Sequence, residues 1–179
     1  MAQQPPGGPD DIPPPPQSAA PEAPSGATAL AWAVHHLAVA TTEVDVATAP
    51  SLGLGASDYL ALKYLTATDE PCGPVELGRI LGMTSGAATG LIDRLEHAGH
   101  VRRTPHPRDR RRQVIQVTSR AQQLLVRSLL PLATDIDETA AALTGEEQRL
   151  VADTLTHIAA LHRRHARAVA GRPASGQNS

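Results

Sequence analysis

The chain has 179 residues, of which 41% are hydrophobic and 2% aromatic, and its formal net charge is −2. This length favours one packed domain, and the dominance of alanine and leucine over aromatic residues favours helices over sheet. A single cysteine excludes an internal disulfide and fits a reducing cytoplasm. We expect neither a secretory signal nor a membrane span, because the sequence has no apolar stretch of the required length.

Both ends of the chain have the composition of tails. Residues 1–27 contain nine prolines and three acidic residues. Such a segment cannot bury enough apolar surface to offset its chain entropy, so we predict a disordered acidic tail. Residues 171–179 are predicted to form a second, shorter tail, which leaves 28–170 for the folded domain.

Two helices are predicted in the first part of this domain. Apolar residues recur at helical spacing over 28–48, and Pro50 and Gly53 are expected to end the first helix. A second helix is predicted after Gly55, which suits the N-cap, with Asp58 in the first turn, where the helix dipole favours an acid. The apolar positions of the second helix are Tyr59, Leu60, Leu62 and Leu65.

The next stretch has the pattern of two helices joined by a tight turn. A short helix over 75–81 is predicted, with Pro74 at its first position and Gly73 as its cap. The following helix begins with Thr84 as N-cap and ends at Gly99. Its apolar residues lie three or four positions apart and form one buried stripe, consisting of Ala88, Leu91, Ile92 and Leu95.

A hairpin and two long helices complete the domain. Residues 100–118 alternate between apolar and polar on both sides of a proline-containing tip, which predicts two strands. A fifth helix is predicted from Ser119 to Ala142, with a kink at Pro131. The sixth begins with a capping box at 144–147 and runs to about Val169.

The basic charge of the chain is concentrated in and after the helix-turn-helix. Eight arginines lie between Arg94 and Arg120, against two acidic residues, Glu96 and Asp109. No lysine or arginine precedes Lys63. Phosphate backbones attract such a patch, and the release of their counterions drives binding. A solvated charged loop is the alternative, but the position of the patch favours a nucleic-acid interface.

The second helix of the helix-turn-helix begins with small residues. A helix that enters the major groove needs such a start, because bulk there would hold it away from the base edges. The predicted DNA-binding residues of this helix are Thr84, Ser85, Gly86, Ala87, Thr89, Gly90 and Arg94. Arginines of a hairpin can insert into a narrow minor groove. The predicted DNA-binding residues of the hairpin are Arg103, His106, Arg108, Arg110, Arg111 and Arg112.

These motifs resemble the MarR family of multiple-antibiotic-resistance-type regulators. The resemblance rests on LIDRLEHAGHVRR (91–103), on P-x-D-R-R (107–111) and on a V-T pair (117–118) that enters a long helix. It implies a mainly α fold with a small β-hairpin wing. A winged helix-turn-helix domain at about 54–118 would be joined by long dimerisation helices from both chain ends.

The resemblance also implies a function. Members of the family are homodimers that read a pseudo-palindrome in double-stranded DNA, with half-sites about 10 bp apart. The implied activity is that of a transcriptional repressor released by a small-molecule effector. In the family, an acid of the recognition helix orients an arginine of the wing, and the matching residues here are Asp93 and Arg111.

Family effectors bind between the dimerisation helices and the DNA-binding lobe. The candidate residues for lining such a pocket are Trp32, His35, His36 and Tyr59. Ordinary core or interface packing is the alternative for each of them. The two histidines are adjacent in the sequence and are expected to point apart.

Other functions find less support in the sequence. Cys72 lies in a loop, whereas redox-sensing relatives carry a cysteine in the first helix. The histidines lack the spacing of metal ligands, so we expect neither a metal nor a cofactor. We find no nucleophile–base set and no phosphate loop, which argues against an enzyme. A winged helix that binds another protein instead of DNA is the remaining alternative, although it would not need the basic hairpin.

Overall fold

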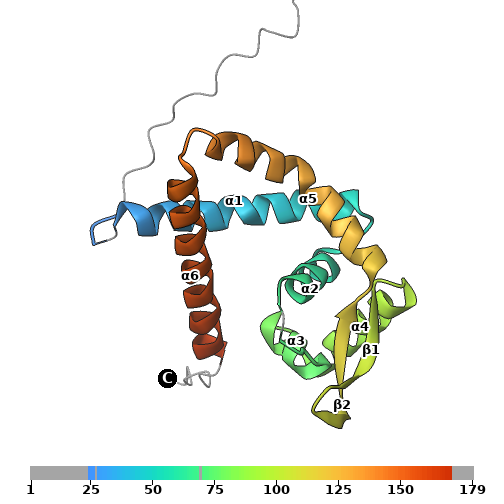
Figure 1. Ribbon diagram of the computed structural model, residues 1–179. Helices are drawn as coiled ribbons and strands as arrows, with labels where there is room; N and C mark the ends of the chain where they lie inside the picture. The colour runs from blue at the N-terminus through green and yellow to red at the C-terminus, as the bar shows by residue number, and fades with distance from the viewer. Residues whose placement is uncertain (1–23, 27, 69, 171–179) are drawn as a thin grey trace, which may run out of the picture. The chain divides into compact units, whose positions relative to one another are not determined.

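The computed structural model describes residues 24–26, 28–68 and 70–170. Apart from 24–26, the predicted tails over 1–27 and 171–179 lie outside the described residues. Within the described part, six helices and one two-stranded antiparallel sheet follow one another in the order shown in Figure 1. This arrangement confirms the predicted fold class, which was mainly helical with a small β-hairpin.

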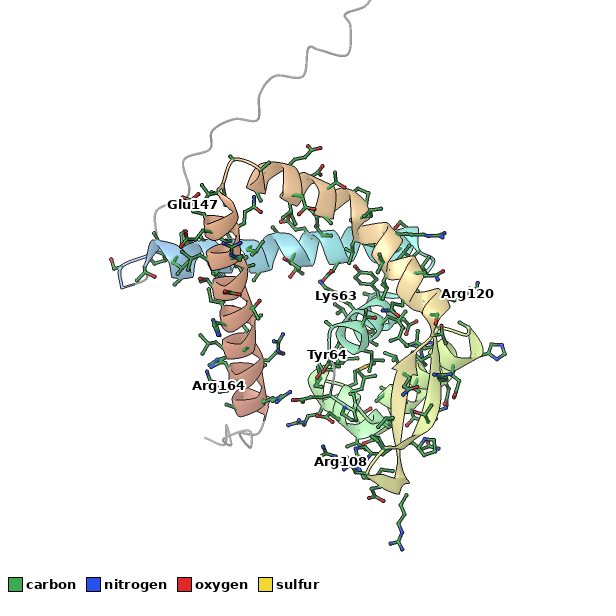
Figure 2. All side chains as sticks on the ribbon, in the orientation of Figure 1. Lys63, Tyr64, Arg108, Arg120, Glu147 and Arg164 are labelled. Carbon is green, nitrogen blue, oxygen red and sulfur yellow. The ribbon has the colours of Figure 1, made fainter. Side chains whose placement is uncertain are left out.

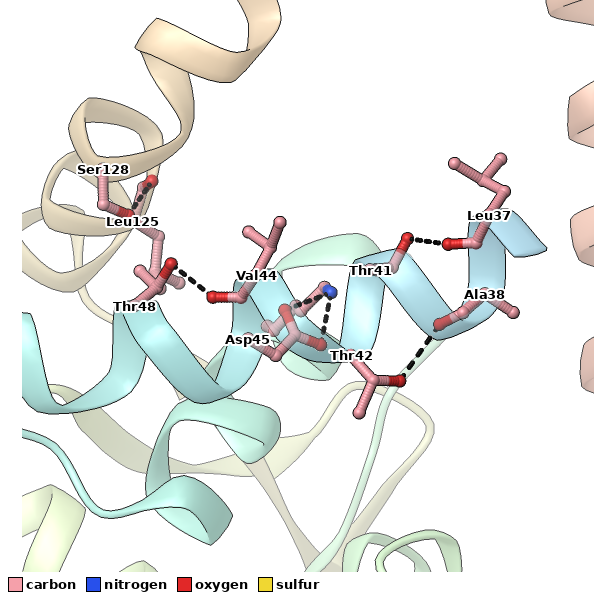
Figure 3. Close-up of polar contacts among 10 residues, drawn as sticks. Leu37, Ala38, Thr41, Thr42, Val44, Asp45, Thr48, Leu125 and Ser128 are labelled. Atoms are coloured by element: carbon pink, nitrogen blue, oxygen red, sulfur yellow. Dashed lines mark hydrogen bonds and ion pairs between the residues drawn. The ribbon is translucent and has the colours of Figure 1, made fainter. Parts of the chain in front are cut away.

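The chain divides into two compact units that meet at Glu43 and Val44, inside α1 (Ala29–Ser51). The hydroxyl groups of Thr41, Thr42 and Thr48 donate to the carbonyl oxygens four residues earlier, at 2.7, 3.0 and 2.7 Å (Figure 3). Threonine hydroxyls can compete with the helix backbone for hydrogen bonds. Here they bond to backbone carbonyls of the same helix, so the hydroxyl groups are satisfied while the segment remains helical.

The first helix ends where Pro50 and Gly53 were expected to end it, because α1 includes Pro50 and stops at Ser51. Proline removes only its own N–H from the helical ladder. The amide of Leu52 still donates to the carbonyl oxygen of Thr48 at 3.3 Å, and the amide of Leu54 donates to that of Ala49 at 3.0 Å. Gly53 has a φ of +69°, and its amide donates to the carbonyl oxygen of Pro50 at 3.0 Å. Together with the five-residue bond from Leu54 to Ala49, this is the glycine cap that ends the helix.

The second unit has its core among α2 (Ala56–Ala67), α3 (Pro74–Ile80) and α4 (Ser85–His97). Glycines cap α2 and α3, and Thr84 caps α4, as predicted. Of the four apolar positions of α2, Leu60 is 41% exposed, whereas Tyr59, Leu62 and Leu65 are buried. The largest fully buried side chains of this core are Tyr59, Leu62, Leu77, Leu91, Ile92 and Leu95.

The turn between α3 and α4 is tight. Gly82 has a φ of +65°, in the left-handed region that suits glycine, and the amide of Met83 donates to the carbonyl oxygen of Gly78 at 2.8 Å. The two helices approach closely at Gly78, where a Cβ atom would lie only 2.8 Å from the Cβ atom of Ala88. The pair has the helix-turn-helix arrangement that the sequence predicts.

The hairpin consists of β1 (Val101–His106) and β2 (Asp109–Val117), which pair in antiparallel register along most of their length. The register shifts between Pro105 and His106, and His106 then lies opposite Asp109. Proline has no N–H to donate to the ladder. The end of the hairpin is therefore irregular, and local contacts rather than the ladder place the residues at its tip.

Two long helices follow the hairpin. α5 (Ser119–Ala140) contains Pro131, and α6 (Gly145–Ala170) starts with the predicted capping box. The amide of Glu147 donates to Thr144 Oγ1 at 3.3 Å, and the Glu147 carboxylate accepts the N–H of Thr144 at 2.8 Å. None of the described α6 residues is buried. The large apolar side chains that these helices expose are Val126, Leu130, Leu132 and Ile136 on α5, and Leu150, Val151, Leu155, Leu161 and Val169 on α6.

Candidate nucleic-acid interface

The start of α4 exposes small side chains. Thr84 Oγ1 accepts the N–H of Ala87 at 3.3 Å, which fixes the first turn, and the predicted stripe from Ala88 to Leu95 faces the core. Of the predicted groove-facing residues, Gly90 is half-buried, and the exposed ones are Thr84, Ser85, Gly86, Ala87 and Thr89. The cap occupies the N–H of Ala87, so the exposed backbone of Ser85 and Gly86 supplies the N–H groups for an anion such as a phosphate.

Arg94 is held by a carboxylate of another helix. Its Nη2 atom donates to Asp58 Oδ1 at 2.8 Å, and this ion pair joins α4 to the first turn of α2. Asp58 is mostly buried, with 17% of its side chain exposed, whereas 61% of the Arg94 side chain is exposed. The pair gives Arg94 a structural role, and its predicted contact with DNA stays a prediction.

The predicted pair between Asp93 and Arg111 is wrong, because Asp93 binds Arg103. Arg103 Nη2 donates to Asp93 Oδ1 at 2.5 Å, and Nη1 donates to the carboxylate of Glu96. The backbone N–H of Arg103 also donates to Glu96 Oε1, at 3.1 Å. The hydrogen bond to Asp93 and the charge of Glu96 raise the pKa of Arg103, against the opposing effect of burial. Arg103 therefore ties the wing to the recognition helix.

The hairpin register explains why Arg103 takes this place. Arg103 lies in the regular part of the ladder, whereas Arg111 lies beyond the register shift. The backbone N–H of Arg111 donates to Asp109 Oδ1 at 3.1 Å, and its side chain is exposed. Glu96 was not among the predicted site residues, although it lies three residues after Asp93 and so on the same helix face. That spacing was the available signal for a two-carboxylate site.

The unpaired positive charge of the wing lies near its tip. Arg108, Arg111 and Arg112 are exposed, and among the residues described they form no ion pair. Figure 2 shows Arg108 at the tip. Arg102 instead donates to the side-chain oxygen of Gln116 at 3.2 and 3.1 Å. The side chain of Arg110 is not among those the structure describes. Three arginines are therefore available to phosphates at one end of the hairpin.

His106, the remaining predicted wing residue, is half-buried and binds the backbone of the tip. Its Nδ1 atom accepts the N–H of Arg108 at 3.1 Å and the N–H of Asp109 at 3.2 Å. The sequence predicted His106 as a DNA contact and did not predict these hydrogen bonds to the backbone. The hydrogen bonds show that it organises the tip from within.

The candidate effector residues fall into both units. In the first, Trp32 stacks on His35 with ring centroids 5.0 Å apart and meets His36 edge-on at 4.8 Å. The expectation that the two histidines point apart was wrong, because both rings contact the same tryptophan. In the second unit, Tyr59 is fully buried, and burial and the nearby Asp45 raise its pKa. Tyr59 is thus a core residue, and a pocket formed by these four residues stays a prediction.

The second unit has a cavity of about 320 Å³ that contains none of these four residues. Its apolar lining comes from Tyr64, Ile80 and Ala166, and Arg79 and Arg163 also line it. The residues come from α2, α3 and the C-terminal part of α6. A site of this composition suits a small ligand with an apolar body and a negative charge.

Cys72 belongs to the core of the second unit. The residue is buried, and desolvation followed by the charge of Glu76 raises its pKa to about 11. The thiol is therefore protonated at neutral pH. No group of three or more histidine, cysteine and acidic residues gathers within the described ranges. Nor does any described helix combine the length and apolarity that crossing a bilayer requires.

Sequence comparisons match the segment that carries this interface. The sequence profile of the MarR family matches residues 52–112. YcgE, an HTH-type transcriptional regulator of Bacillus subtilis, is 34% identical over 105 residues, which cover 59% of this chain and 68% of YcgE. PapX, an HTH-type transcriptional regulator of Escherichia coli, is 32% identical over 96 residues, which cover 53% of this chain and 58% of PapX.

Solved structures share the fold. A point mutant of MepR from a multidrug-resistant S. aureus clinical isolate has a TM-score of 0.62 at 16% identity, covering 74% of this chain and 96% of MepR. The transcriptional regulator Tm0710 of Thermotoga maritima has a TM-score of 0.51 at 24% identity, covering 74% of this chain and 94% of Tm0710. These likenesses confirm the winged-helix fold that the sequence predicts.

Proposed function

We propose that the chain, which belongs to the MarR family of DNA-binding transcriptional regulators, is a homodimeric repressor of a pseudo-palindromic operator. It would act in the cytoplasm, and a small-molecule effector would release it from DNA. The observation that carries the proposal is the pairing of two features on one segment. The small, exposed start of α4 suits the major groove, and the unpaired arginines of the wing tip suit the neighbouring minor groove.

The proposed division of labour follows from the ion pairs. The residues that enter the major groove would be Ser85, Gly86 and Thr89, while Arg108 and Arg111 contact the minor groove and its phosphates. Arg103 would not contact phosphate, because Asp93 and Glu96 already neutralise it. It would instead hold the wing at a fixed position relative to α4.

A homodimer is supported by the apolar surface of α5 and α6. Leu130 and Ile136 on α5 are 58% and 57% exposed, and Leu150 and Leu161 on α6 are 66% and 52% exposed. Large exposed apolar patches mark interaction surfaces, because water contact with them is unfavourable. A symmetric dimer would cover these faces and present two recognition helices about one turn of DNA apart.

Release by an effector is supported by the cavity that Tyr64, Ile80 and Arg163 line. An effector shifts the regulator away from DNA only if it binds one conformation of the dimer better than the other. Because α3 precedes the recognition helix and α6 contributes to the proposed dimer surface, a ligand between them could change the spacing of the two recognition helices.

The proposal is tested by fluorescence anisotropy with the duplex that precedes the chain's own coding sequence, beside a scrambled duplex of equal length. A salt series is run for both. We expect tight binding to the first duplex, a clear preference over the second, and an affinity that falls steeply with salt. Sedimentation equilibrium of the free protein should give a dimer. Equal and weak binding to both duplexes would favour a winged helix that serves a protein partner.

A further inference from the structure

The tip of the wing is closed by a histidine side chain. His106 Nδ1 accepts two backbone hydrogen bonds, from the N–H of Arg108 at 3.1 Å and from the N–H of Asp109 at 3.2 Å. Asp109 in turn accepts the N–H of Arg111 at 3.1 Å through Oδ1. These contacts, which begin at His106, fix the backbone conformation at two exposed arginines, Arg108 and Arg111.

The ladder alone does not fix this turn. Pro105 and Pro107 have no N–H to donate, and the register shifts between Pro105 and His106. A side-chain acceptor therefore supplies hydrogen bonds at the point where the sheet pairing becomes irregular. Asparagine and aspartate commonly do this in turns, and the δ-nitrogen of histidine occupies the same position relative to the backbone.

The two hydrogen bonds determine the chemical state of the ring. A nitrogen that accepts hydrogen bonds cannot carry a proton, so the proton of the neutral ring is on Nε2. Addition of a second proton must place it on Nδ1, where it opposes the N–H groups of Arg108 and Asp109. The closed tip therefore requires a neutral His106.

We infer that His106 is a positioning residue of the wing, whose neutral imidazole closes the tip and aims its arginines at DNA, and whose protonation opens the tip and weakens DNA binding. The inference rests on the proposed function of this surface. The geometry fixes only the direction of the effect, because a proton on Nδ1 is incompatible with both backbone hydrogen bonds.

Whether protonation of His106 weakens or strengthens DNA binding distinguishes this inference from simple charge attraction. The charged residues that follow His106 in the chain, apart from Arg110, are Arg108, Asp109, Arg111 and Arg112, and all four are exposed. Farther along β1, Arg103 is already paired with two carboxylates of α4. If the charge of His106 were its only effect, protonation would strengthen binding to phosphates. Loss of the closed tip predicts the opposite.

The test compares the wild-type chain with His106→Asn and His106→Ala, each as the full-length protein. The asparagine side chain offers an oxygen acceptor in place of Nδ1 and does not titrate, whereas alanine offers no acceptor. Anisotropy is measured with the duplex that precedes the chain's own coding sequence, at about pH 5.5 and about pH 8 and at constant ionic strength.

We expect the wild-type affinity to fall by about three- to thirtyfold at the lower pH, the range for losing one or two net hydrogen bonds. His106→Asn should bind like the wild type at the higher pH and lose this dependence. His106→Ala should bind weakly at both pH values, and its remaining pH dependence measures the other histidines. A wild-type chain that binds more tightly in acid, or that follows the His106→Ala profile, would overturn the inference.

A second readout does not use DNA. Long-range ¹H–¹⁵N correlation spectra of the free protein distinguish the two tautomers of a neutral imidazole. We expect His106 to be protonated on Nε2 at about pH 8. A ring protonated on Nδ1 would overturn the inference whatever the DNA result. If no variant binds the duplex at any pH but the Nε2 tautomer is found, the proposed function fails while the closed tip stands.

Discussion

Replacing Arg103 by alanine distinguishes a residue that holds the wing from one that contacts phosphate. The change removes both side-chain ion pairs between β1 and α4 but leaves the backbone N–H that donates to Glu96. The Arg103 side chain is 23% exposed, so it is partly screened by water, and Asp93, at 58%, is screened more strongly. Exposed ion pairs contribute about 0.2–1 kcal/mol each, which gives an expected loss of about 1 kcal/mol in the free energy of unfolding.

The stability assay is urea unfolding, with Arg102→Ala as the matched control. Arg102 is the preceding residue of the same strand and donates only to the side chain of Gln116, so its loss should cost clearly less. The double mutant Arg103→Ala with Glu96→Ala should cost less than the two single changes together, because the two residues share one interaction. Additive losses would contradict the ion-pair network.

The DNA assay separates the two roles. Removal of a phosphate contact lowers the slope of log affinity against log salt by about 0.9, whereas removal of a positioning residue weakens binding without that change. We expect Arg103→Ala to weaken DNA binding without changing the slope of log affinity against log salt. Arg111→Ala should weaken binding and also reduce that slope. A slope for Arg103→Ala that falls by about 0.9, with unchanged stability, would refute the reasoning.

Three further predictions concern α4, Cys72 and the start of α6. A Cβ atom at Gly86 would meet nothing within 4 Å, so Gly86→Ala should stabilise the fold by up to about 1 kcal/mol in thermal unfolding and yet weaken DNA binding. The control Gly78→Ala should destabilise the fold by about 1–3 kcal/mol, because its Cβ atom would clash with Ala88. Unchanged DNA affinity of Gly86→Ala would contradict entry of α4 into the groove. Because the pKa of Cys72 is about 11, iodoacetamide should modify the native protein far more slowly at about pH 8 than the urea-unfolded chain, and equal rates would argue against its burial. Hydrogen bonds from the backbone and hydroxyl of Thr144 lower the pKa of Glu147 from 4.5. The stabilisation of the α6 start is therefore complete above about pH 4.5 and lost as the pH falls through the folded-state pKa, which hydrogen exchange of the first-turn amides should detect. A Glu147→Gln control, whose side chain does not titrate, should lack this dependence.

The elements that the sequence predicts well are those set by local chemistry. The stripe from Ala88 to Leu95 follows from helical periodicity, and the caps at Thr84 and Thr144 follow from side-chain oxygens next to free amides. The end of α1 at Ser51 is local in the same way, because Gly53 supplies the left-handed backbone that caps the helix just after Pro50.

The partners of charged side chains were harder to predict. Which arginine of the hairpin reaches Asp93 depends on how the two strands pair and on how the hairpin packs against α4, and neither follows from a short-range pattern. The contact of Arg94 with Asp58 joins residues 36 positions apart and arises only when α2 and α4 pack together. The sequence located the basic surface, but the fold decides which of its arginines are already neutralised.

The central claim, sequence-specific DNA binding through α4 and the wing, is tested most directly by selection. Duplexes bound by the full chain are recovered from a random pool, and the affinity for the recovered sequence is compared with that for its scramble at equal salt. The account predicts convergence on two half-sites about 10 bp apart and a preference of about a thousandfold or more. A pool that does not converge, with equal affinities for both duplexes, would contradict it.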